Sequence, residues 1–574
     1  MATRDTLTDT LEKIALLLEL QGENPFKVRA YRQGAEAVAA YPGDIVAKAA
    51  ANELAGISGI GEALRQKLHE LASTGKLEFY EKLCAQFPGT IFELFEIPGL
   101  GPKKIAALHR ELGVGSVAEL KAACESGAAA KLAGFGAKTA QKILEGIAYN
   151  ASHAGIFRAA DAAPAAEAIL SWLKAHPKIS RAEVAGSYRR GKEIVRDLDF
   201  VAATKDGAAV LADFAQQPFA AAVLAQGETK SSIRLANGCQ CDLRAVSAAE
   251  FPTALVYFTG SKEHNVALRA RALKRGWSLN EYRLEGCPDA IADEAALYRA
   301  LGLDFIPSEL REDRGEIDAA ENGTLPRLIE LGQLRGTFHN HTTASDGIAT
   351  LEEMAQAARD LGLQYLGIAD HSKASFQASG LDEKRLLAQV AAIRKLNAAA
   401  DDGFRLFAGS EVDILRDGSL DFSDEILAQL DYAVASVHNA FSLSEAEMTK
   451  RIIRAVENPF VTILGHLTGR LLLKREPYAV DVPAVIDACA ATGTIIELNA
   501  NPWRLDMDWR WWPLAKEKGV RTSINPDAHS TDDLQFLWHG IRAARKGWLT
   551  ASDVINTQPL SAIEAILAAK RLRS

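Results

Sequence analysis

The sequence predicts a multidomain protein with an all-α N-terminal region, an α+β middle region and a C-terminal α/β region resembling a barrel. Two observations predict this. The 574 residues are too many for one ordinary hydrophobic core. The pattern also changes along the chain: helical spacing without a convincing strand comes first, short β-like runs follow from residue 181, and apolar runs ending in polar residues follow residue 335. We therefore expect five segments: 1–155, 156–250, 251–315, a charged, turn-rich linker at 316–334, and 335–574.

Composition excludes several classes of protein. Hydrophobic residues make up 48% of the chain, too many for a disordered protein, and the net charge of −9 argues against coating nucleic acid by a bulk positive field. The six cysteines include no C-x-x-C pair, which disfavours a disulfide framework or a structural zinc knot. The chain has neither a long uncharged apolar stretch nor an apolar start. We therefore expect a cytoplasmic, nucleoid-associated protein without a membrane partner, whose DNA contacts are local.

The helical N-terminal region contains a small repeat. Gly-apolar-Gly occurs three times before a helical stretch, as Gly59-Ile60-Gly61, Gly99-Leu100-Gly101 and Gly134-Phe135-Gly136. Two close glycines permit a tight turn whose backbone N–H groups face a phosphate at a helix N-terminus. One such motif is more often an ordinary interhelical turn, but the repetition, with Lys103 and Lys104 behind the second copy, favours phosphate binding by the first two. They resemble helix-hairpin-helix units, which bind the DNA backbone without reading bases.

Three aspartates of the middle region form a candidate metal site. Asp197 and Asp199 lie two apart in a strand-like run, so both carboxylates face one side. In CQCDLRAV, alternation places Asp242 opposite to its apolar neighbours, as a third carboxylate from a nearby strand. Three such groups can hold two Mg²⁺ ions that polarise an attacking hydroxyl and neutralise nucleotide phosphates. A D-x-D pair alone is also common on surface strands.

The order of motifs around these aspartates is similar to a known family. GS-x-RR, D-x-D, a third strand aspartate and YFTGSKEHNVALR resemble the nucleotidyltransferase palm and thumb of family X DNA polymerases, the group of DNA polymerase beta, over residues 1 to about 315. The resemblance implies that Asp242 receives the proton of the primer 3′-hydroxyl. It implies nucleotide binding by Gly186, Ser187, Arg190, Tyr257, Phe258, Gly260 and Asn265. It implies DNA binding by Gly59, Gly61, Gly99, Gly101, Lys103 and Arg269.

Some positions depart from that family or remain open. Arg196 stands where the family usually has glycine, so we expect an altered backbone approach to the phosphates. Gln240 replaces an arginine that braces the third aspartate in the animal enzyme, so we expect Asp242 to be less firmly oriented. Lys67 matches the Schiff-base lysine of the animal lyase domain, although an exposed helical lysine is the simpler interpretation. Residues 265–275 carry four basic side chains, which form a phosphate-binding strip or a solvated helix face.

Beyond residue 335, seven apolar runs end in metal-ligand residue types, at steps of 27 to 40 residues. Each step fits one strand plus one helix, and barrel sites form at the C-terminal ends of strands. The candidate ligands are His339, His341, Asp346, His371, Glu411, His438, His466, Asp527 and His529. A single histidine there is usually only hydrogen-bonded in place, but six of the seven local histidines occupy run ends. Such a cluster can hold two or three ions of Zn²⁺, Mn²⁺ or Fe²⁺ and generate hydroxide for attack on phosphorus.

The order HNH, SDG, DHS, E, H, GH, DAH resembles the polymerase and histidinol phosphatase (PHP) domain, which implies a distorted (βα)7 barrel. Its junction to a family X polymerase is typical of bacterial and archaeal enzymes. The family is associated with Mn²⁺-favoured 3′-to-5′ exonuclease activity, and with 3′-phosphatase and abasic-site endonuclease activities in some members. Four tryptophans either stack on a frayed 3′ base or pack against the barrel: Trp503, Trp509, Trp511 and Trp512.

Together these patterns predict a repair polymerase that fills short gaps and trims 3′ ends. We expect Mg²⁺ at the aspartates, Mn²⁺ or Zn²⁺ at the histidine-rich cluster, dNTPs and gapped, nicked or primer-template DNA as substrates, and a monomer. A phosphoesterase with a decayed polymerase half is one alternative, and it would lose a palm aspartate or the YFTG segment; both are present. A scaffold that bridges DNA ends is another, and it leaves twelve candidate ligands without a purpose.

Overall fold

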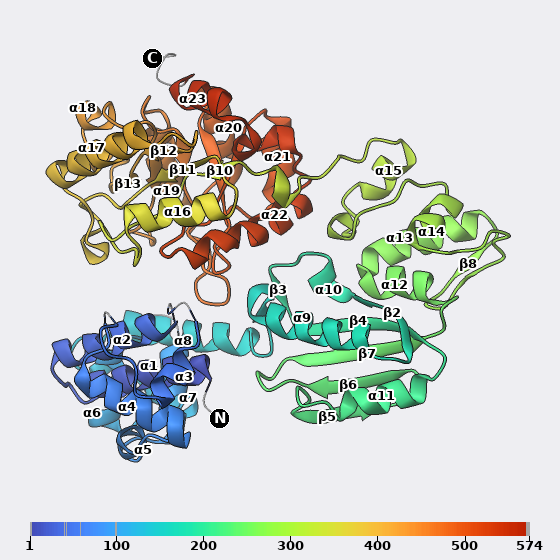
Figure 1. Ribbon diagram of the computed structural model, residues 1–574, viewed down its shortest axis with the longest axis horizontal. Coiled ribbons are helices and arrows are strands. Elements are labelled where there is room, and N and C mark those ends of the chain that lie inside the picture. The colour runs from blue at the N-terminus through green and yellow to red at the C-terminus, as the bar shows by residue number, and fades with distance from the viewer. Residues whose placement is uncertain (1–2, 40, 42, 58, 98–99, 570–574) are drawn as a thin grey trace. The chain divides into compact units, whose positions relative to one another are not determined.

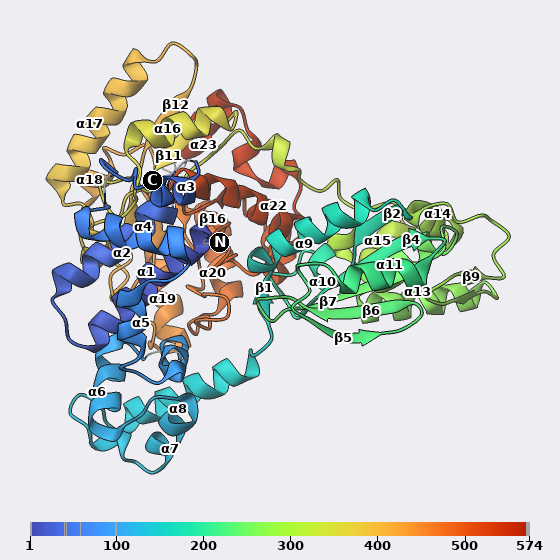
Figure 2. The same ribbon diagram turned by 60° about the horizontal axis from the view of Figure 1, so that its bottom comes forward.

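A computed structural model describes residues 3–39, 41, 43–57, 59–97 and 100–569 of the chain (Figures 1 and 2). The chain divides into two compact units, Met1–Ala154 and Gly155–Ser574, and each is described by itself. Among the described residues, no helix combines the length and the apolar character that crossing a bilayer requires.

The first unit is all-α over its described residues. Its helices are α1 (Arg4–Leu20), α2 (Pro25–Ala39), α3 (Ile45–Ala50), α4 (Glu62–Thr74), α5 (Glu78–Cys84), α6 (Pro102–Leu112), α7 (Val117–Glu125) and α8 (Ala137–Ser152), with 3-10 turns η1 (Gly89–Glu96) and η2 (Ala129–Lys131). The second glycine of each repeat, Gly61, Gly101 or Gly136, is the N-cap of α4, α6 or α8, with no side-chain cap. The first backbone N–H groups of these helices therefore have no side-chain acceptor at the cap.

The palm is a five-stranded sheet with the order β2-β4-β7-β6-β5. Its strands are β2 (Ile179–Val184), β4 (Asp197–Thr204), β5 (Ala222–Gln226), β6 (Lys230–Arg234) and β7 (Gln240–Val246). The central pair, β4 and β7, is parallel, and the other neighbours are antiparallel. Helices α9 (Ala159–Ala175) and α11 (Gly207–Ala215) share one apolar core with Leu198 and Phe200, so they cover the face that the even-numbered residues of β4 form (Figure 1).

The opposite face of the palm positions the aspartates. Helix α12 (Phe251–Thr259) packs on Val201 and Ala203, which are in strand register with Asp197 and Asp199. The apolar half of this face is thus covered by α12. The half of this face that carries Asp197 and Asp199 is not part of the apolar cluster under α12.

The thumb contains α12, α13 (Lys262–Lys274), β8 (Ser278–Leu279), β9 (Leu284–Glu285), α14 (Glu294–Ala300), η3 (Ser308–Leu310) and α15 (Glu316–Glu321). The start of the predicted linker differs from expectation, because α15 packs into the thumb. Glu316 is fully buried, with Oε1 2.6 Å from His264 Nδ1. Arg311, just before it, is also fully buried and donates to Glu294. The predicted linker therefore begins with a buried, paired carboxylate, while Asp318 and Glu321 of the same helix are exposed.

The C-terminal region is a distorted barrel of parallel strands. They are β10 (Gly336–Thr337), β11 (Tyr365–Ile368), β12 (Arg405–Ala408), β13 (Glu411–Asp413), β14 (Val434–Ser436), β15 (Ile463–Leu464), β16 (Ile495–Asn499) and β17 (Thr522–Asn525). Strands β10 to β12 form one sheet and β13 to β17 another. A bridge between His371 and Glu411 connects the sheets on one side, and a bridge between Asn340 and Ala528 connects them on the other. The outer helices are α16 (Leu351–Asp360), α17 (Glu383–Ala399), α18 (Asp424–Leu427), α19 (Glu445–Val456), α20 (Val482–Thr492), α21 (Trp512–Glu517), α22 (Leu537–Lys546) and α23 (Leu560–Ala569).

Two candidate metal centres

The three palm aspartates lie side by side on the two central strands. In the β4–β7 register Asp199 is directly opposite Asp242, and Asp197 is opposite Gln240. The apolar neighbours Cys241 and Leu243 face the buried core on the other side. Strand alternation therefore brings the predicted trio together on one face.

The trio has the electrostatics of a cation site. Burial, together with the charges of Asp197 and Asp242, raises the pKa of Asp199 to about 7, and burial and Asp242 also raise the pKa of Asp197. Such carboxylates repel one another until positive charge joins them. The oxygen-only donor set fits Mg²⁺.

Asp242 is held from two sides. Gln240 Nε2 donates to Asp242 Oδ1 at 3.0 Å, and Lys230 Nζ lies 2.5 Å from Oδ2. Gln240 therefore contacts Asp242, and the looser orientation of Asp242 expected in the absence of an arginine stays a prediction. The glutamine amide makes the bracing contact, and a lysine from the neighbouring strand β6 supplies the charge.

The predicted nucleotide-binding turn lies against the trio. Helix α10 (Gly186–Arg189) begins at Gly186, whose φ of +62° is in the left-handed region. A Cβ there would lie 2.0 Å from Asp199 Oδ2, so only glycine permits this approach. Ser187, Arg196 and Asp197 line a cavity of about 460 Å³ beside the turn, into which Arg470 and Arg510 of the barrel also extend.

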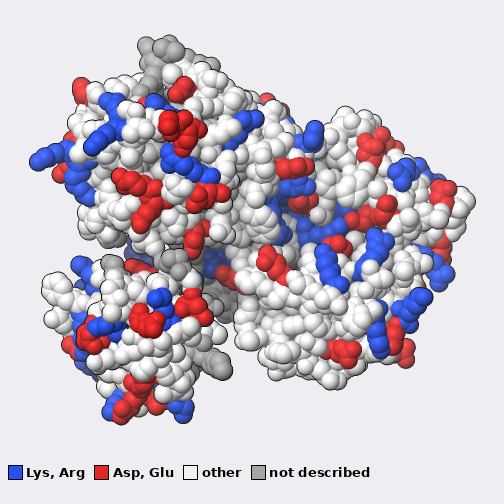
Figure 3. Space-filling model, viewed as in Figure 1, with Lys and Arg blue, Asp and Glu red and all other residues white. Residues whose placement is uncertain are grey.

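The predicted thumb residues gather at the end of α12. Asn265 Nδ2 donates to Tyr257 O at 2.7 Å, and Arg269 donates to the Tyr257 hydroxyl at 3.0 Å. Arg190 donates to Thr259 O, next to Gly260. On the face shown in Figure 3, several Lys and Arg side chains lie in the hollow between palm and thumb, with Asp and Glu side chains among them.

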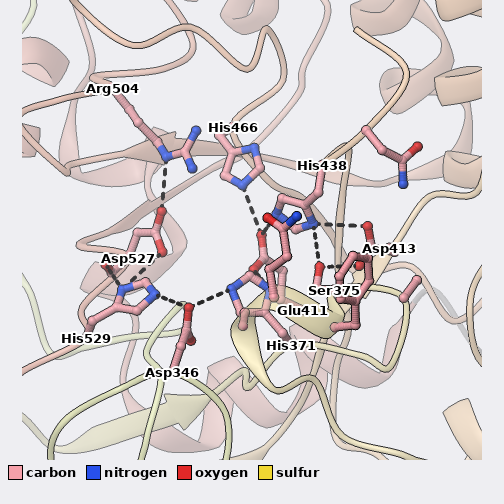
Figure 4. Close-up of a pocket in the computed structure, with 15 residues that line it drawn as sticks. Asp346, His371, Ser375, Glu411, Asp413, His438, His466, Arg504, Asp527 and His529 are labelled. Carbon is pink, nitrogen blue, oxygen red and sulfur yellow. Dashed lines mark hydrogen bonds and ion pairs between the residues drawn. The ribbon is translucent and has the colours of Figure 1, made fainter. Parts of the chain in front are cut away.

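The nine predicted barrel ligands converge around three carboxylates, as Figure 4 shows for most of them. Glu411 has an oxygen 2.8–3.1 Å from a ring nitrogen of His371, His438 and His466, and His339 Nε2 lies 3.4 Å from it. Asp527 Oδ1 lies 3.3 Å from His341 Nε2 and 3.6 Å from His339 Nε2. Asp346 lies between His371 and His529, at 3.6 and 3.4 Å. Ligands from the ends of six βα units thus form one cage, and only the unit of β16 supplies none of the nine.

The cage fits transition metals by its donor set. Eight of the nine ligands belong to groups whose donor atoms lie within 4.8 Å of one another. Both ring nitrogens of His341 and Nε2 of His339 are buried and make no hydrogen bond to the residues that the structure describes. Burial and the neighbouring imidazoles lower the pKa of His341 to about 4, which keeps the ring in its neutral, metal-binding form. Imidazole and carboxylate donors together suit Zn²⁺, Mn²⁺ or Fe²⁺. A metal bound there would supply Lewis acidity and an activated water.

Comparison with known proteins agrees with this arrangement. Family models match residues 3–77 as a helix-hairpin-helix domain, 91–148 as a SAM-like helix-hairpin-helix tandem, 254–312 as the DNA polymerase beta thumb and 337–501 as a PHP domain. The chain is 39% identical over 563 residues to the DNA polymerase/3′-5′ exonuclease PolX of Bacillus subtilis (strain 168), covering 97% of this chain and 98% of that protein. The chain belongs to the PolX family. The chain is also 29% identical over 230 residues to a probable phosphatase of Thermoanaerobacter sp. (strain X514), which is 38% of this chain and 89% of the phosphatase.

The side chains that contact the barrel histidines from behind were not predicted from the sequence. Glu497 is fully buried and lies 2.7 Å from His339 Nδ1, while Asp413 Oδ1 lies 3.1 Å from His438 Nδ1. Such contacts hold imidazole rings in place for metal binding. A signal existed for Asp413, because it lies two residues after Glu411 on β13. Most of the ligands line a cavity of about 390 Å³. Two further residues line this cavity and were not predicted: Arg504, which lies 3.2 Å from Asp527, and Phe376, which is 77% exposed.

The remaining predicted residues belong to neither ligand set. Lys67 is on α4 with its Nζ 4.8 Å from the Phe79 ring centre. Gly99 lies outside the described residues, whereas Lys103 is in the first turn of α6. Among the tryptophans, Trp509 and Trp512 are buried, Trp511 is partly buried against the barrel core, and Trp503 is exposed beneath the Arg158 guanidinium. Packing therefore accounts for the first three.

Proposed function

We propose that this protein is a DNA-directed DNA polymerase with a metal-dependent 3′-5′ exonuclease, and that it fills short gaps in DNA repair. One observation carries the proposal: a single chain holds two separate metal-type cages, an aspartate trio and a nine-ligand imidazole and carboxylate cage. A relative that aligns over nearly the whole chain is named DNA polymerase/3′-5′ exonuclease. Both halves act on one substrate class, DNA with a 3′ end at a gap or nick.

In the polymerase half, Asp197, Asp199 and Asp242 would hold two Mg²⁺ ions, which would neutralise the nucleotide phosphates. Asp242 receives the proton of the primer hydroxyl, a role supported by its bracing contact from Gln240. The turn at Gly186, with Ser187 and Arg190, holds the triphosphate of a dNTP. Tyr257, Phe258 and Gly260 lie under its sugar, Asn265 contacts the new base pair and Arg269 the template. The glycine turns and Lys103 of the first unit bind the DNA backbone.

In the barrel half, the nine ligands would hold two to three Mn²⁺ or Zn²⁺ ions, which would supply Lewis acidity and an activated water for hydrolysis of the 3′-terminal phosphodiester. The partial similarity to proteins named probable phosphatases supports a further action on 3′-phosphates, with abasic-site cleavage as a related phosphoester reaction. The protein acts as a monomer, in contact with the nucleoid.

Two substitutions in the full chain test the assignment. Asp242→Asn is expected to reduce primer extension by about 10³-fold or more while 3′ degradation stays near the parental rate, because the cages share no ligand. His339→Ala is expected to do the reverse. Asp213→Asn, an exposed aspartate on α11, and His539→Ala, outside the cage on α22, are the matched controls.

Two results would contradict the proposal. Primer extension at the parental rate by Asp242→Asn removes the trio as the polymerase site. A purified protein that binds less than one equivalent of transition metal after reconstitution, measured by plasma emission spectrometry, favours a DNA-bridging scaffold instead.

A further inference from the structure

A helix of the barrel contacts the nucleotide-binding turn of the palm within the second unit. Arg542, on α22, donates to the carbonyl oxygen of Tyr188 in α10. One turn later Lys546 Nζ donates to the carbonyl oxygen of Arg190 at 3.0 Å. A Cβ at Gly191 would lie 3.6 Å from Arg542 O, so the two backbones are in close contact. The barrel thus contacts the main chain of this turn at two successive points.

The same contact includes a shared carboxylate. Glu312 Oε1 lies 2.7 Å from Lys546 Nζ and 3.0 Å from Arg190 Nε, and Oε2 lies 3.4 Å from Lys192 Nζ. Burial raises the pKa of Glu312, but the charges of Lys546 and Arg190 outweigh burial and lower it to about 2. One buried anion therefore connects a barrel lysine to the predicted triphosphate-binding arginine.

Lys546 is a lysine whose ammonium group is buried at the contact between barrel and palm. Its side chain is only 1% exposed, and burial lowers its pKa to about 8 although Glu312 opposes that shift. A third bond joins its Nζ to Glu309 O at 3.3 Å, and the Trp509 ring centre lies 4.6 Å away. Lysine is rarely buried unless paired. Its three polar partners all belong to the palm and thumb, none to its own domain.

The opposite side of the turn contacts the aspartate trio. The backbone at Gly186 lies against the Asp199 carboxylate, and Ala185 N donates to Asp199 O at 2.7 Å. The turn is therefore held between Asp199 on one side and α22 on the other. A displacement of α22 would change the position of Arg190 relative to Asp199.

We infer that Lys546 is a positioning residue for the polymerase site: from the barrel domain it holds Arg190, directly through its carbonyl and indirectly through Glu312, in the place where a nucleoside triphosphate binds. The inference rests on the proposed function of Arg190. It means that the polymerase half depends on the barrel as a structural support, and that this dependence does not pass through the barrel's metal cage.

Lys546→Met in the full chain tests this inference. Methionine keeps the unbranched apolar stem and removes the charge and all three hydrogen bonds. We expect the KM for a dNTP in single-nucleotide gap filling to rise about tenfold, with kcat within threefold of the parental value, because loss of one buried charged contact is on that scale. The 3′ degradation rate is expected to stay parental. Lys516→Met is the control, because the Lys516 ammonium pairs with a carboxylate of its own domain, Asp553 at 2.9 Å, at a more exposed position.

A double-mutant cycle gives a second readout. Glu312→Gln alone is expected to raise the KM for a dNTP, and the double variant with Lys546→Met to raise it by clearly less than the product of the two single effects. If Lys546→Met does not fold, as judged by its 3′ degradation rate and thermal unfolding, Arg542→Gln takes its place, with the same expected change in KM.

Four outcomes separate the possibilities. A parental KM in Lys546→Met overturns the inference, and so does an equal loss of polymerase and nuclease activity in a variant whose thermal unfolding is parental. If Asp242→Asn also extends primers normally, the proposed polymerase site fails instead. Loss of extension in Asp242→Asn together with a parental KM in Lys546→Met leaves the proposed function intact and rejects only the role of Lys546.

Discussion

Removal of the buried carboxylate of Glu316 is expected to open the end of the thumb. Glu316 accepts from His264 at 2.6 Å and from the backbone N–H groups of Asp313 and Arg314 at 2.8 and 2.6 Å, and it is fully buried. Breaking a buried pair by removing one partner costs about 3–5 kcal/mol. Glu316→Ala should therefore lower the local free energy of opening of α14 and α15 by about 3 kcal/mol or more.

Hydrogen exchange measures this change locally, which matters because a multidomain chain does not unfold in one step. Three kcal/mol corresponds to exchange on the order of 100-fold faster for the amides of residues 294–321. Asp318→Ala, an exposed position on the same helix, should change exchange by less than about threefold. Exchange within threefold of the parental rate in Glu316→Ala would mean that the start of the predicted linker, at residue 316, is solvated after all.

Three more predictions follow from individual contacts. Because the folded pKa of Glu312 is lowered to about 2, its contribution to stability is present above its unfolded pKa of about 4.5 and is lost as the pH falls towards 2. Acid titration followed by Trp fluorescence should show α22 contacts weakening in that window, and a signal that stays constant through it would contradict the prediction. Gly186→Ala should abolish primer extension and spare 3′ degradation, since its Cβ would overlap Asp199; parental extension would refute the close approach. Gln240→Ala should lower kcat for extension about tenfold with little change in the KM for a dNTP, because Asp242 loses an orienting hydrogen bond. An unchanged kcat would mean that Lys230 alone orients Asp242.

Periodicity predicted the parts of both cages that lie on regular elements. Alternation along one strand predicts that Asp197 and Asp199 share a face, and the pairing of β4 with β7 places Asp242 beside Asp199. The barrel ligands follow strands at regular steps, so the shared edge of a parallel sheet brings them together. In each case the local residue pattern determines which way the side chains point, and the sheet determines which of them lie close together.

The remaining features depend on tertiary partners that no local pattern contains. Residues Arg311 and Glu316 lie in a segment that appears solvated because charge density is high, yet each is buried against a partner 17 or 52 residues away. Gln240 lacks the positive charge of an arginine, and only the strand pairing shows that Lys230 on the adjacent strand places a positive charge beside Asp242. Glu497 ends an apolar run without a ligand motif, and only its contact with His339 reveals its role. The partners of each pair are far apart in the sequence, so no local pattern indicates the contact between them.

The junction between barrel and palm shows what such distant pairs do. The barrel supplies the cations and the palm and thumb supply the anions, in the pairs Arg470–Glu193, Arg545–Glu309 and Lys546–Glu312. Buried ion pairs add little net stability, because desolvation of the charges offsets their attraction. An apolar junction would tolerate sliding of one surface over the other, whereas each of these charges is satisfied in only one register. The junction therefore specifies which end of α22 meets the nucleotide-binding turn, and this specificity is what a polymerase site with little tolerance for displacement requires.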